Sequence, residues 1–307
     1  MWKTTPPILM DSGGRIVKAT GGFYYVQTKA ALVECRGRGL LRKEGVSPVV
    51  GDMVTLRLSP EGTGTVETIL PRKNELIRPP LANLEQMVLV VSVCDPEPNL
   101  FVIDTFLAVL EHKGIAPLLA FTKVDLESSG EAQRLTELYG GAGFSVLVCS
   151  SQTGEGIEQL MAALAGKLSA FSGNSGVGKS SLLNAIDPRL SIPTGITSKK
   201  LGRGKHTTRH VEVFTLPNGG LVADTPGFSS VDLLRMSDLR ADALADCFRE
   251  IIPYTGKCRF ADCKHLREAG CAVLRAVEQQ EIACSRFQSY KQMYEQLKDV
   301  KEWERKT

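Results

Sequence analysis

A glycine-rich stretch, GNSGVGKS, begins at Gly173 and carries the first chemistry that the sequence suggests. It matches G-x-x-x-x-G-K-[ST], in which glycines let successive backbone N–H groups turn inward around phosphate oxygens at a helix N-terminus. We expect Lys179 to reach the β- and γ-phosphates of a nucleotide, and Ser180 to ligate Mg²⁺. The predicted phosphate loop comprises Gly173, Asn174, Ser175, Gly176, Val177, Gly178, Lys179, Ser180 and Ser181.

The stretch LVADTPG places a carboxylate at the end of an apolar, strand-like run. Asp224, followed by Thr-Pro-Gly227, matches the D-x-x-G motif of GTPases. In that motif the aspartate holds Mg²⁺, usually through water, and the glycine N–H senses the γ-phosphate. Because a phosphate loop lies in the same chain, we assign these two roles to Asp224 and Gly227.

A third motif, FTKVDL, follows the apolar run GIAPLLA and resembles the guanine-reading sequence Asn-Lys-x-Asp. In such a site Asp125 accepts two hydrogen bonds from the guanine edge, which adenine cannot donate, and Lys123 lies over the base. Thr122 has one donor where asparagine has two, so we expect its support of the phosphate loop to be weaker. Together with Val124, these residues form the predicted guanine site.

A serine-containing segment, CSSQTGEG, follows the strand-like run FSVLV. It resembles the S-A-x segment of GTPases, in which a backbone N–H reads guanine O6. Ser150 and Ser151 take that place here, which extends the predicted guanine site.

The motifs occur in an unusual order, since an ordinary GTPase has its phosphate loop first. Here the guanine motif and the Ser150 segment precede the phosphate loop, and D-x-x-G comes last. A circular permutation explains this order, because joining two nearby termini and opening the chain elsewhere preserves the sheet and the site. The opening falls just after D-x-x-G, so we hypothesise that the γ-phosphate repositions the region that follows.

The loop after the predicted phosphate-loop helix contains GRGKHTTRH, where a GTPase has its first switch. A threonine there completes the Mg²⁺ shell, and Thr207 and Thr208 both qualify. Many GTPases place glutamine after D-x-x-G to orient the attacking water, but Phe228 cannot do so, which predicts slow intrinsic hydrolysis. We expect His206, another part of this loop or a partner to position the water; an ordinary exposed histidine is the alternative interpretation of His206.

The same loop is strongly basic. Between Pro188 and Val211 there is no acidic residue, and six residues are basic: Arg189, Lys199, Lys200, Arg203, Lys205 and Arg209. Such a run is either a solvated loop or a contact for an anion or RNA.

A cysteine-rich stretch, CRFADCKHLREAGC, gives the spacing Cys258-x₄-Cys263-x-His265-x₅-Cys271. Three thiolates and one imidazole suit tetrahedral Zn²⁺, and four protein ligands leave no position open for catalysis. We predict one structural zinc ion; buried free cysteines beside a surface histidine are the alternative. Four neighbouring basic residues are placed to meet phosphate: Lys257, Arg259, Lys264 and Arg267.

The elements that must position these residues fall into three regions. Residues 15–70 contain short, strand-like runs separated by glycine and proline, typical of a small β-barrel such as the OB-fold. From about residue 86, apolar strands alternate with helices, which indicates a parallel α/β sheet covered on both faces. After residue 235 a helical stretch, SDLRADALADCFREI, precedes the cysteines, and one or two amphipathic helices end the chain. We predict domains at 1–75, 83–235 and 236–307.

Length and composition exclude several classes of protein. The chain has 307 residues, 43% of them hydrophobic, and a net charge of only +3. No apolar run approaches the roughly 20 residues of a membrane span, and the N-terminal stretch lacks the features of a secretory signal. We therefore expect a cytoplasmic, monomeric protein without disulfides, in which clustered cysteines bind metal.

The chain resembles a known family, the circularly permuted, ribosome small subunit-dependent GTPase A proteins. The resemblance is carried by TKVD, GNSGVGKSSLLN, GRGKHTTRH, DTPGF and the cysteine-rich stretch, and it covers nearly the whole chain. It implies an N-terminal OB-fold domain that binds RNA, a circularly permuted GTPase domain and a C-terminal α-helical zinc-binding domain. It also implies GTP hydrolysis to GDP, with Mg²⁺, stimulated by the 30S subunit and its 16S rRNA in late small-subunit maturation.

Two other functions fit part of the sequence. A P-loop ATPase or kinase shares the phosphate loop, but the TKVD motif argues against it. An RNA-binding nucleotide switch with little turnover is compatible with Phe228, which removes the usual water-orienting side chain.

Overall fold

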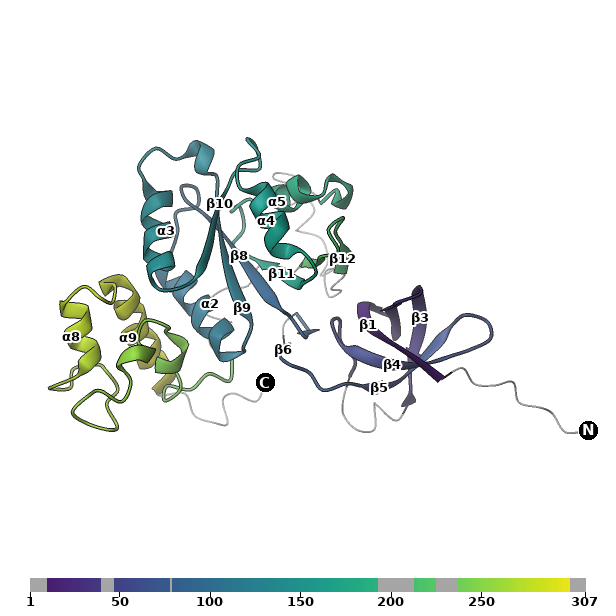
Figure 1. Ribbon diagram of the computed structural model, residues 1–307, viewed down its shortest axis with the longest axis horizontal. Helices are drawn as coiled ribbons and strands as arrows, with labels where there is room; N and C mark the ends of the chain where they lie inside the picture. The colour runs from purple at the N-terminus through teal and green to yellow at the C-terminus, as the bar shows by residue number, and fades with distance from the viewer. Residues whose placement is uncertain (1–9, 40–46, 78, 193–212, 225–236, 299–307) are drawn as a thin grey trace, which may run out of the picture. The chain divides into compact units, whose positions relative to one another are not determined.

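A computed structural model of the chain describes residues 10–39, 47–77, 79–192, 213–224 and 237–298 (Figure 1). Its contacts divide the chain into two compact units. The first unit contains residues 1–85, 164–170 and 201–226, and the second contains residues 86–163, 171–200 and 227–307.

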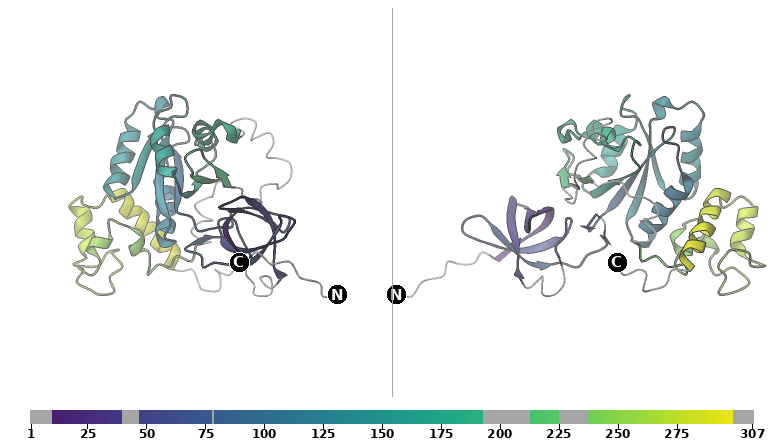
Figure 2. Two further views of the ribbon diagram at one scale, coloured as in Figure 1. Left: turned by 45° about the vertical axis from the view of Figure 1, so that its right-hand side comes forward. Right: turned by 180° about the vertical axis from the view of Figure 1, so that it is seen from behind.

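The N-terminal strands form a closed barrel in the order β1-β2-β3-β5-β4, and the left view of Figure 2 looks into it. Strand β1 closes the barrel because it pairs antiparallel with both β2 and β4. Alternating side chains such as Val26, Val54 and Val66 are fully buried and fill its interior. The predicted small β-barrel is confirmed. Its strands are β1 (Met10–Thr20), β2 (Phe23–Thr28), β3 (Leu32–Gly37), β4 (Met53–Leu58) and β5 (Gly64–Ile69).

The chain that leaves the barrel is fastened to it. Arg72 donates from Nε and Nη2 to the two carboxylate oxygens of the buried Asp52, at 2.8 and 2.9 Å. Asn83 donates to the carbonyl oxygen of Gly51 at 3.1 Å and accepts from the backbone N–H of Lys73 at 2.9 Å. A two-stranded sheet, β6 (Glu75–Leu76) with β7 (Leu81–Ala82), completes this ordered connection.

Six strands form one sheet in the order β10-β9-β8-β11-β13-β12. Strands β8, β9 and β10 are parallel to one another, and β12 and β13 form an antiparallel hairpin. Every residue of β8 and of β11 is buried, as expected for parallel strands covered on both faces. The strands are β8 (Gln86–Ser92), β9 (Ala116–Thr122), β10 (Ser145–Cys149), β11 (Leu168–Ser172), β12 (Val213–Thr215) and β13 (Leu221–Asp224).

Helices cover both faces of the strands in the second unit. Figure 1 shows α2 and α3 on one face and α4 and α5 on the other. Phe106, Leu107 and Leu135 from α2 and α3 pack with Leu119 and Phe121 of β9 in a continuous apolar core. The helices are α2 (Leu100–His112), α3 (Glu131–Gly141), α4 (Ile157–Leu164) and α5 (Lys179–Ile186).

The C-terminal segment contains helices α8 (Ala272–Glu278) and α9 (Cys284–Lys298), in agreement with the one or two helices expected there. The helix expected over SDLRADALADCFREI is wrong, because this stretch consists of turns and the short 3₁₀ helix η3 (Ala245–Cys247). Its apolar residues nevertheless lie in one core: Leu239, Leu244, Cys247, Phe248 and Ile251. Consecutive tight turns bring these side chains into the core. The helix-like spacing of the apolar residues in this stretch therefore does not indicate a helix. A second 3₁₀ helix, η4 (Ile252–Tyr254), leads to the cysteines.

Helix α2 contacts both the parallel strands and the C-terminal helical segment of the second unit. It packs against α9 as well as against β8 and β9 (Figure 1). Its middle, from Ile103 to Leu110, is buried throughout. Within the described part of the chain, no helix combines the length and the apolar character that crossing a membrane requires.

Candidate nucleotide and metal sites

The predicted phosphate loop connects the buried strand β11 to the N-terminus of α5. A Cβ atom on Gly173 would lie 2.4 Å from the carbonyl oxygen of Val90, so only glycine fits where the loop leaves the strand. Gly178 precedes α5 with a φ of +91°, a conformation that glycine adopts without strain. Residues Asn174, Ser175 and Gly176 are exposed between these two points. The loop therefore presents its backbone to solvent at a helix N-terminus, as phosphate binding requires.

Thr122 ends β9 and contacts the phosphate loop directly. Its hydroxyl oxygen lies 2.5 Å from the carbonyl oxygen of Val177 and 3.3 Å from that of Val91. A hydroxyl has one proton to donate, and Val177 is the nearer acceptor. The side chain is buried, so water does not compete for this bond. Thr122 thus joins the guanine motif to the phosphate loop with its single donor.

The segment 94–99, which follows β8, lies beside the phosphate loop and was not predicted as part of the site. The Nζ of Lys123 donates to the carbonyl oxygen of Asp95. A Cβ atom on Gly176 would lie 3.8 Å from Cδ of Pro96, and Pro96 lines a crevice together with Gly173 and Asn174. We call residues 94–99 the strap. Its two prolines, in CDPEPN directly after a buried strand, are the signal that marks a rigid connection in the sequence.

Asp125 is placed where a base can reach it. It lies in the 3₁₀ helix η1 (Val124–Leu126) and is exposed. Glu127, two residues later, accepts from the hydroxyl of Ser129 at 2.6 Å and from the backbone N–H of Glu131 at 3.1 Å. These bonds, that from Ser129 first, lower the pKa of Glu127 to about 2. The loop that carries Asp125 is therefore anchored at both ends, because Lys123 bonds the strap and Glu127 bonds the first residue of α3.

The Ser150 segment forms a tight turn after β10. The hydroxyl of the buried Ser150 accepts from the backbone N–H groups of Gln152 and Thr153, at 3.2 and 3.1 Å. The backbone N–H of Ser150 donates to the carbonyl oxygen of Glu155 at 3.0 Å. The hydroxyl and the backbone N–H of Ser150 are therefore both bonded inside the turn. This leaves the backbone N–H of Ser151 as the candidate donor to a base.

The remaining predicted nucleotide residues fall at the edge of the described chain or beyond it. Asp224 is the last residue of β13, which agrees with its predicted place at a strand end. His206, Thr207, Thr208, Gly227 and Phe228 lie outside the described residues. The structure thus brings together the guanine motif and the phosphate loop, and the predicted switch residues remain predictions.

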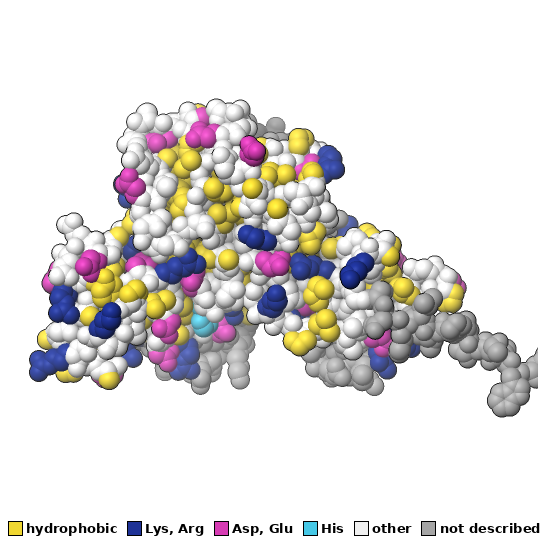
Figure 3. Space-filling view, viewed as in Figure 1, with side chains coloured by type: hydrophobic (Ala, Val, Ile, Leu, Met, Phe, Trp, Pro, Cys, Tyr) yellow, Lys and Arg dark blue, Asp and Glu magenta, His cyan; other side chains and the backbone are white. Residues whose placement is uncertain are grey.

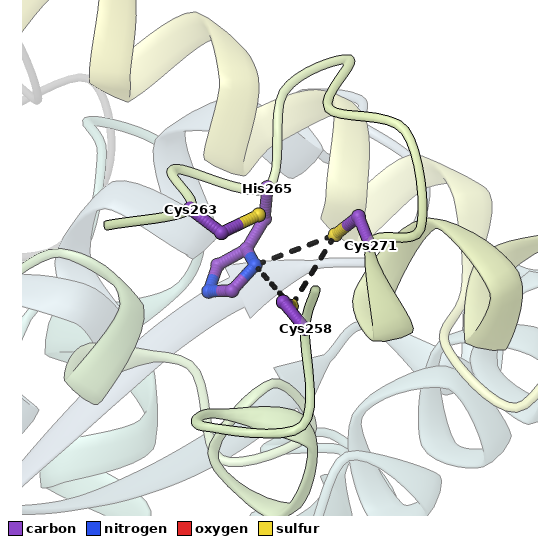
Figure 4. A group of neighbouring side chains, drawn as sticks. All are labelled: Cys258, Cys263, His265 and Cys271. Carbon is purple, nitrogen blue, oxygen red and sulfur yellow. Dashed lines mark hydrogen bonds between the residues drawn. The ribbon is translucent and has the colours of Figure 1, made fainter. Parts of the chain in front are cut away.

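The four predicted metal ligands lie together, with their ligand atoms all within 4.8 Å of one another (Figure 4). The Sγ atoms of Cys258 and Cys271 are 3.7 Å apart, and Nδ1 of His265 lies 3.5 and 3.4 Å from them. A tetrahedral ion with metal–sulfur bonds of about 2.3 Å and metal–nitrogen bonds of about 2.0 Å has edges of roughly 3.8 and 3.5 Å. The cluster, completed by Cys263, therefore has the dimensions of a tetrahedral metal site.

The loop that carries these ligands is held by its own backbone. Glu268 accepts from the backbone N–H groups of Lys264, Leu266 and Arg267, at 2.7, 2.7 and 2.9 Å. These three donors enclose His265, whose φ of +60° is uncommon for a residue with a side chain. The hydroxyl of Tyr290 on α9 donates to the carbonyl oxygen of Lys264 at 2.9 Å. Glu268 and Tyr290 thus fix the turn from which His265 reaches the cysteines.

Burial raises the pKa of thiols inside the metal cluster as well as outside it: that of Cys263 to about 12, and that of Cys271 above its ordinary value. Burial raises the pKa of Cys35 and Cys149 to about 11 and that of Cys247 to about 12, so these thiols stay protonated. Cys258 has a lowered pKa, because backbone and cysteine hydrogen bonds outweigh its burial, and it accepts from the backbone N–H of Ala272 at 3.3 Å. Burial lowers the pKa of His265, which favours the neutral imidazole that a metal binds.

Basic side chains surround the cluster. Figure 3 shows Lys and Arg at several points on the surface of the C-terminal segment. Those singled out in the sequence are all exposed: Lys257, Arg259, Lys264 and Arg267. Because these side chains are exposed while the neighbouring metal ligands are buried or partly buried, the loop combines a metal site with a cationic surface.

Comparison with family models gives three matches. The model described as RsgA GTPase matches residues 69–234, and the model described as RsgA N-terminal domain matches residues 13–66. A third, described as 50S ribosome-binding GTPase, matches residues 169–300.

Full-length relatives and solved structures are similar as well. The chain is 43% identical over 293 residues to a small ribosomal subunit biogenesis GTPase RsgA from Caldanaerobacter subterraneus, covering 95% of this chain and 97% of that protein. It is 44% identical over 291 residues to the protein of that name from Geobacillus kaustophilus, covering 94% and 98%. The structure of YjeQ from Thermotoga maritima covers 94% of this chain and 99% of its own, with 34% identity and a TM-score of 0.81. That of YloQ, described as a circularly permuted GTPase, covers 95% and 96%, with 37% identity and a TM-score of 0.80.

Proposed function

The chain belongs to the RsgA GTPase family and is a circularly permuted GTPase, and from this premise we propose that it hydrolyses GTP on the 30S ribosomal subunit during late small-subunit maturation. The observation that carries the proposal is the bond from Thr122 to Val177, which joins a guanine motif to a phosphate loop. The names of the full-length relatives support the ribosomal part of the proposal.

Recognition of guanine is assigned to the loops after β9 and β10. Asp125 accepts from the two N–H groups of the guanine edge, and Lys123 covers the base while it remains bonded to the strap. The backbone N–H of Ser151 reads guanine O6, because Ser150 is used within its own turn. Adenine presents the opposite pattern at these positions, so the site selects GTP over ATP.

The phosphates are assigned to the phosphate loop and the residues around it. Backbone N–H groups from Gly173 to Ser181 surround the phosphates, and Lys179 neutralises charge on the β- and γ-phosphates. Ser180, Asp224 and either Thr207 or Thr208 would hold Mg²⁺, and Gly227 would contact the γ-phosphate. When bound, Mg²⁺ supplies positive charge that offsets the negative charge developing on the transferred phosphoryl group.

Positioning of the attacking water is assigned to His206. Phe228 stands where many GTPases have glutamine, and its ring cannot accept a proton or hold a water molecule. Hydrolysis by the free protein is therefore slow, and it accelerates when the ribosomal partner orders the loop that carries His206. Substitution of His206 by alanine removes the stimulated rate and leaves the slow basal rate.

The metal bound by the cysteine cluster is proposed to be Zn²⁺ with a structural role. Three sulfur ligands and one nitrogen ligand suit this ion, and the spacing of Cys258, His265 and Cys271 fits its tetrahedral geometry. Four protein ligands leave no position for water or substrate, so the ion stabilises the segment rather than taking part in hydrolysis.

The three predicted domains, 1–75, 83–235 and 236–307, belong to the same proposal. The first binds 16S rRNA, because a closed five-stranded barrel of this kind binds oligonucleotides in many proteins. The basic surface around the metal site supplies a second contact with RNA. The protein is proposed to act as a monomer in the cytoplasm, where ribosomal subunits are assembled.

The experiment is a comparison of GTP turnover by the full chain alone, with naked 16S rRNA, with 30S subunits and with 50S subunits. We expect stimulation by 30S subunits only. The 50S arm is necessary because one matched family model is described as a 50S ribosome-binding GTPase. Equal turnover in all four reactions would contradict the proposal and favour a nucleotide switch with little hydrolysis. Competition by ATP as effective as that by GTP would instead indicate an ATPase.

A further inference from the structure

Arg286 of α9 is the largest fully buried charged side chain among the described residues. It is 1% exposed and bonds two carboxylates: Nη1 lies 2.7 Å from Oδ1 of Asp104 on α2, and Nε lies 2.7 Å from Oε1 of Glu250. Asp104 is fully buried and also accepts from the hydroxyl of Tyr139 on α3, at 3.0 Å. One guanidinium thus joins α2, α3 and the C-terminal segment.

Three aromatic rings fix the plane of this guanidinium. Its Cζ atom lies 4.7 Å from the ring centre of Phe248, 5.3 Å from that of Phe144 and 5.7 Å from that of Tyr139. A planar fork held by two carboxylates and three rings has few alternative positions. Lysine cannot reproduce it, because an ammonium group has neither the fork nor the flat face. The contact therefore defines where α2 lies against α9.

Further ion pairs repeat the connection toward the C-terminal end of α2. Arg249 bonds Glu111 through Nη2 at 2.7 Å, and its guanidinium lies 4.4 Å from the ring centre of Phe144. Asp238 is paired with His112 and Lys113, at 3.2 and 2.5 Å. These pairs are partly exposed and contribute less than the buried one. All of them connect α2 to the segment that carries the metal ligands.

The other end of α2 leads to the nucleotide site. Asn99, the last residue of the strap, accepts from the backbone N–H of Val102 at 3.2 Å and so begins the helix. The strap continues to Pro96 beside Gly176 of the phosphate loop and to Asp95, which Lys123 holds. The crevice between the strap and the phosphate loop is lined by α2 itself, through Val102, Ile103 and Phe106. A shift of α2 therefore changes the position of the strap against the phosphate loop.

We infer that Arg286 is a positioning residue for the nucleotide site. It holds α2 at one place on the metal-binding segment, and α2 holds the strap against the phosphate loop and Lys123. Ordering of the metal-binding segment then strengthens nucleotide binding, and by linkage nucleotide strengthens metal binding by the same factor. The inference rests on the proposed nucleotide and zinc sites, and it connects them through residues that touch neither ligand.

The test measures the affinity of the full-length, metal-loaded protein for fluorescent GDP, before and after a chelator removes the metal. In the wild-type chain, chelation should weaken GDP binding about threefold to tenfold. In Arg286→Lys, GDP binding should already be weaker by that factor, and chelation should add less than a twofold change. A purely structural role of Arg286 would lower the melting temperature and leave the response to chelation intact.

Two further variants keep the test interpretable. Because an unpaired Asp104 or Glu250 is costly inside the protein, a triple variant, Asp104→Leu and Glu250→Gln with Arg286→Met, removes all three charges and is expected to fold. Arg134→Lys is the matched control, since Arg134 is half exposed and its guanidinium pairs with Glu131 of its own helix. The triple variant should behave like Arg286→Lys, and the control like the wild type.

Wild-type GDP affinity together with a wild-type response to chelation, in folded Arg286→Lys and in the triple variant, would overturn the inference. That result can coexist with GTP turnover stimulated by 30S subunits, which would leave the proposed function standing. Failure of the wild-type chain to bind GDP would instead contradict the proposed function itself.

Discussion

The phosphate loop and the metal-binding loop are both short, polar and rich in turns, yet they are held in different ways. The phosphate loop is fixed by the sheet: β11 is buried before it, Thr122 bonds it from the neighbouring β9, and Gly173 packs against the backbone of β8. Within residues 237–298, which the structure describes, no strand flanks the metal-binding loop. Its order comes from Glu268, Tyr290 and four ligand side chains that converge on one point.

The difference shows where each loop obtains its stability. A loop held between buried strands keeps its shape without a ligand, because backbone and apolar contacts carry the free energy of folding. A loop whose side chains are three thiols and an imidazole lacks that support, so the bound ion becomes part of the folding free energy. We expect nucleotide to select a site that already exists, and metal to create the site that it occupies.

Removal of one metal ligand should produce the largest effect. Cys271→Ser is expected to lose most of the metal-binding free energy, which is about 10 kcal/mol or more in structural zinc sites. The C-terminal segment should then become sensitive to protease, while GDP still binds but about threefold to tenfold more weakly, as after chelation. Metal analysis and limited proteolysis measure the two effects. Cys284→Ser is the control, because Cys284 is an exposed cysteine outside the cluster. Metal content equal to that of the control would contradict the expectation that the metal-binding loop, unlike the phosphate loop, depends on its bound ligand.

Substitution of Asp125, the proposed guanine acceptor, should have the next largest effect, confined to the nucleotide site. Asp125→Asn presents an amide N–H₂ to the N–H groups of guanine, so GTP affinity should fall at least about a hundredfold. Xanthine nucleotides, which carry a carbonyl oxygen at that edge, should bind better than GTP. Fluorescence titration measures both affinities. The control is Asp262→Asn, which alters an exposed acid near the metal ligands; the same loss in this control would remove the assignment of Asp125.

A smaller effect is expected where the guanine motif meets the phosphate loop. Thr122→Val removes the hydroxyl proton that the carbonyl oxygen of Val177 accepts and leaves this buried oxygen with one partner fewer, which costs about 1–2 kcal/mol, or roughly tenfold in GDP affinity. Thr122→Ser retains the hydroxyl and should stay within about twofold of the wild type. Equal affinity of the valine and serine variants would mean that the sheet alone holds the loop, which would sharpen the comparison further.

The smallest effect concerns pH. The pKa of Glu127 is lowered to about 2 by its bonds to Ser129 and Glu131, against 4.5 for an ordinary glutamate. Its contribution to stability is therefore complete above about pH 4.5 and is lost as the pH falls toward 2. Melting curves between pH 2 and 6 should show a shallower decline for Glu127→Gln than for the wild type. Parallel curves would show that the bonds of Glu127 do not hold the loop of Asp125.

The sequence predicts well what depends on short, local patterns. The strand β8 and the helix α2 follow from apolar runs with the right period, and Gly173 to Ser180 follow from the spacing that a phosphate demands. The four metal ligands follow from the spacing of thiols and imidazole, and the structure brings them together. In each case the residues that determine the feature lie within about fifteen positions of one another.

The sequence fails where the decisive partner is distant. The apolar residues of Leu239–Ile251 have helical spacing, but the stretch forms a series of turns. Its apolar side chains pack in one core with residues of α2 and α9. Arg286 and Asp104 are far apart in the chain, so no local pattern announces their contact. A signal does exist at one end: Asp104 is the single acidic residue in the apolar run LFVIDTFLAV, and a buried carboxylate requires a partner. The identity of that partner comes only from the fold.

The burial of α2 on both sides has a practical consequence for anyone who trims this protein. A chain shortened after the D-x-x-G segment would keep every nucleotide-binding motif, but it would leave Asp104 without its guanidinium and expose Ala108 and Val109 to water. Such a fragment should be poorly soluble and prone to self-association. The GTPase domain and the cysteine-rich segment must therefore be expressed, purified and retained together as one chain.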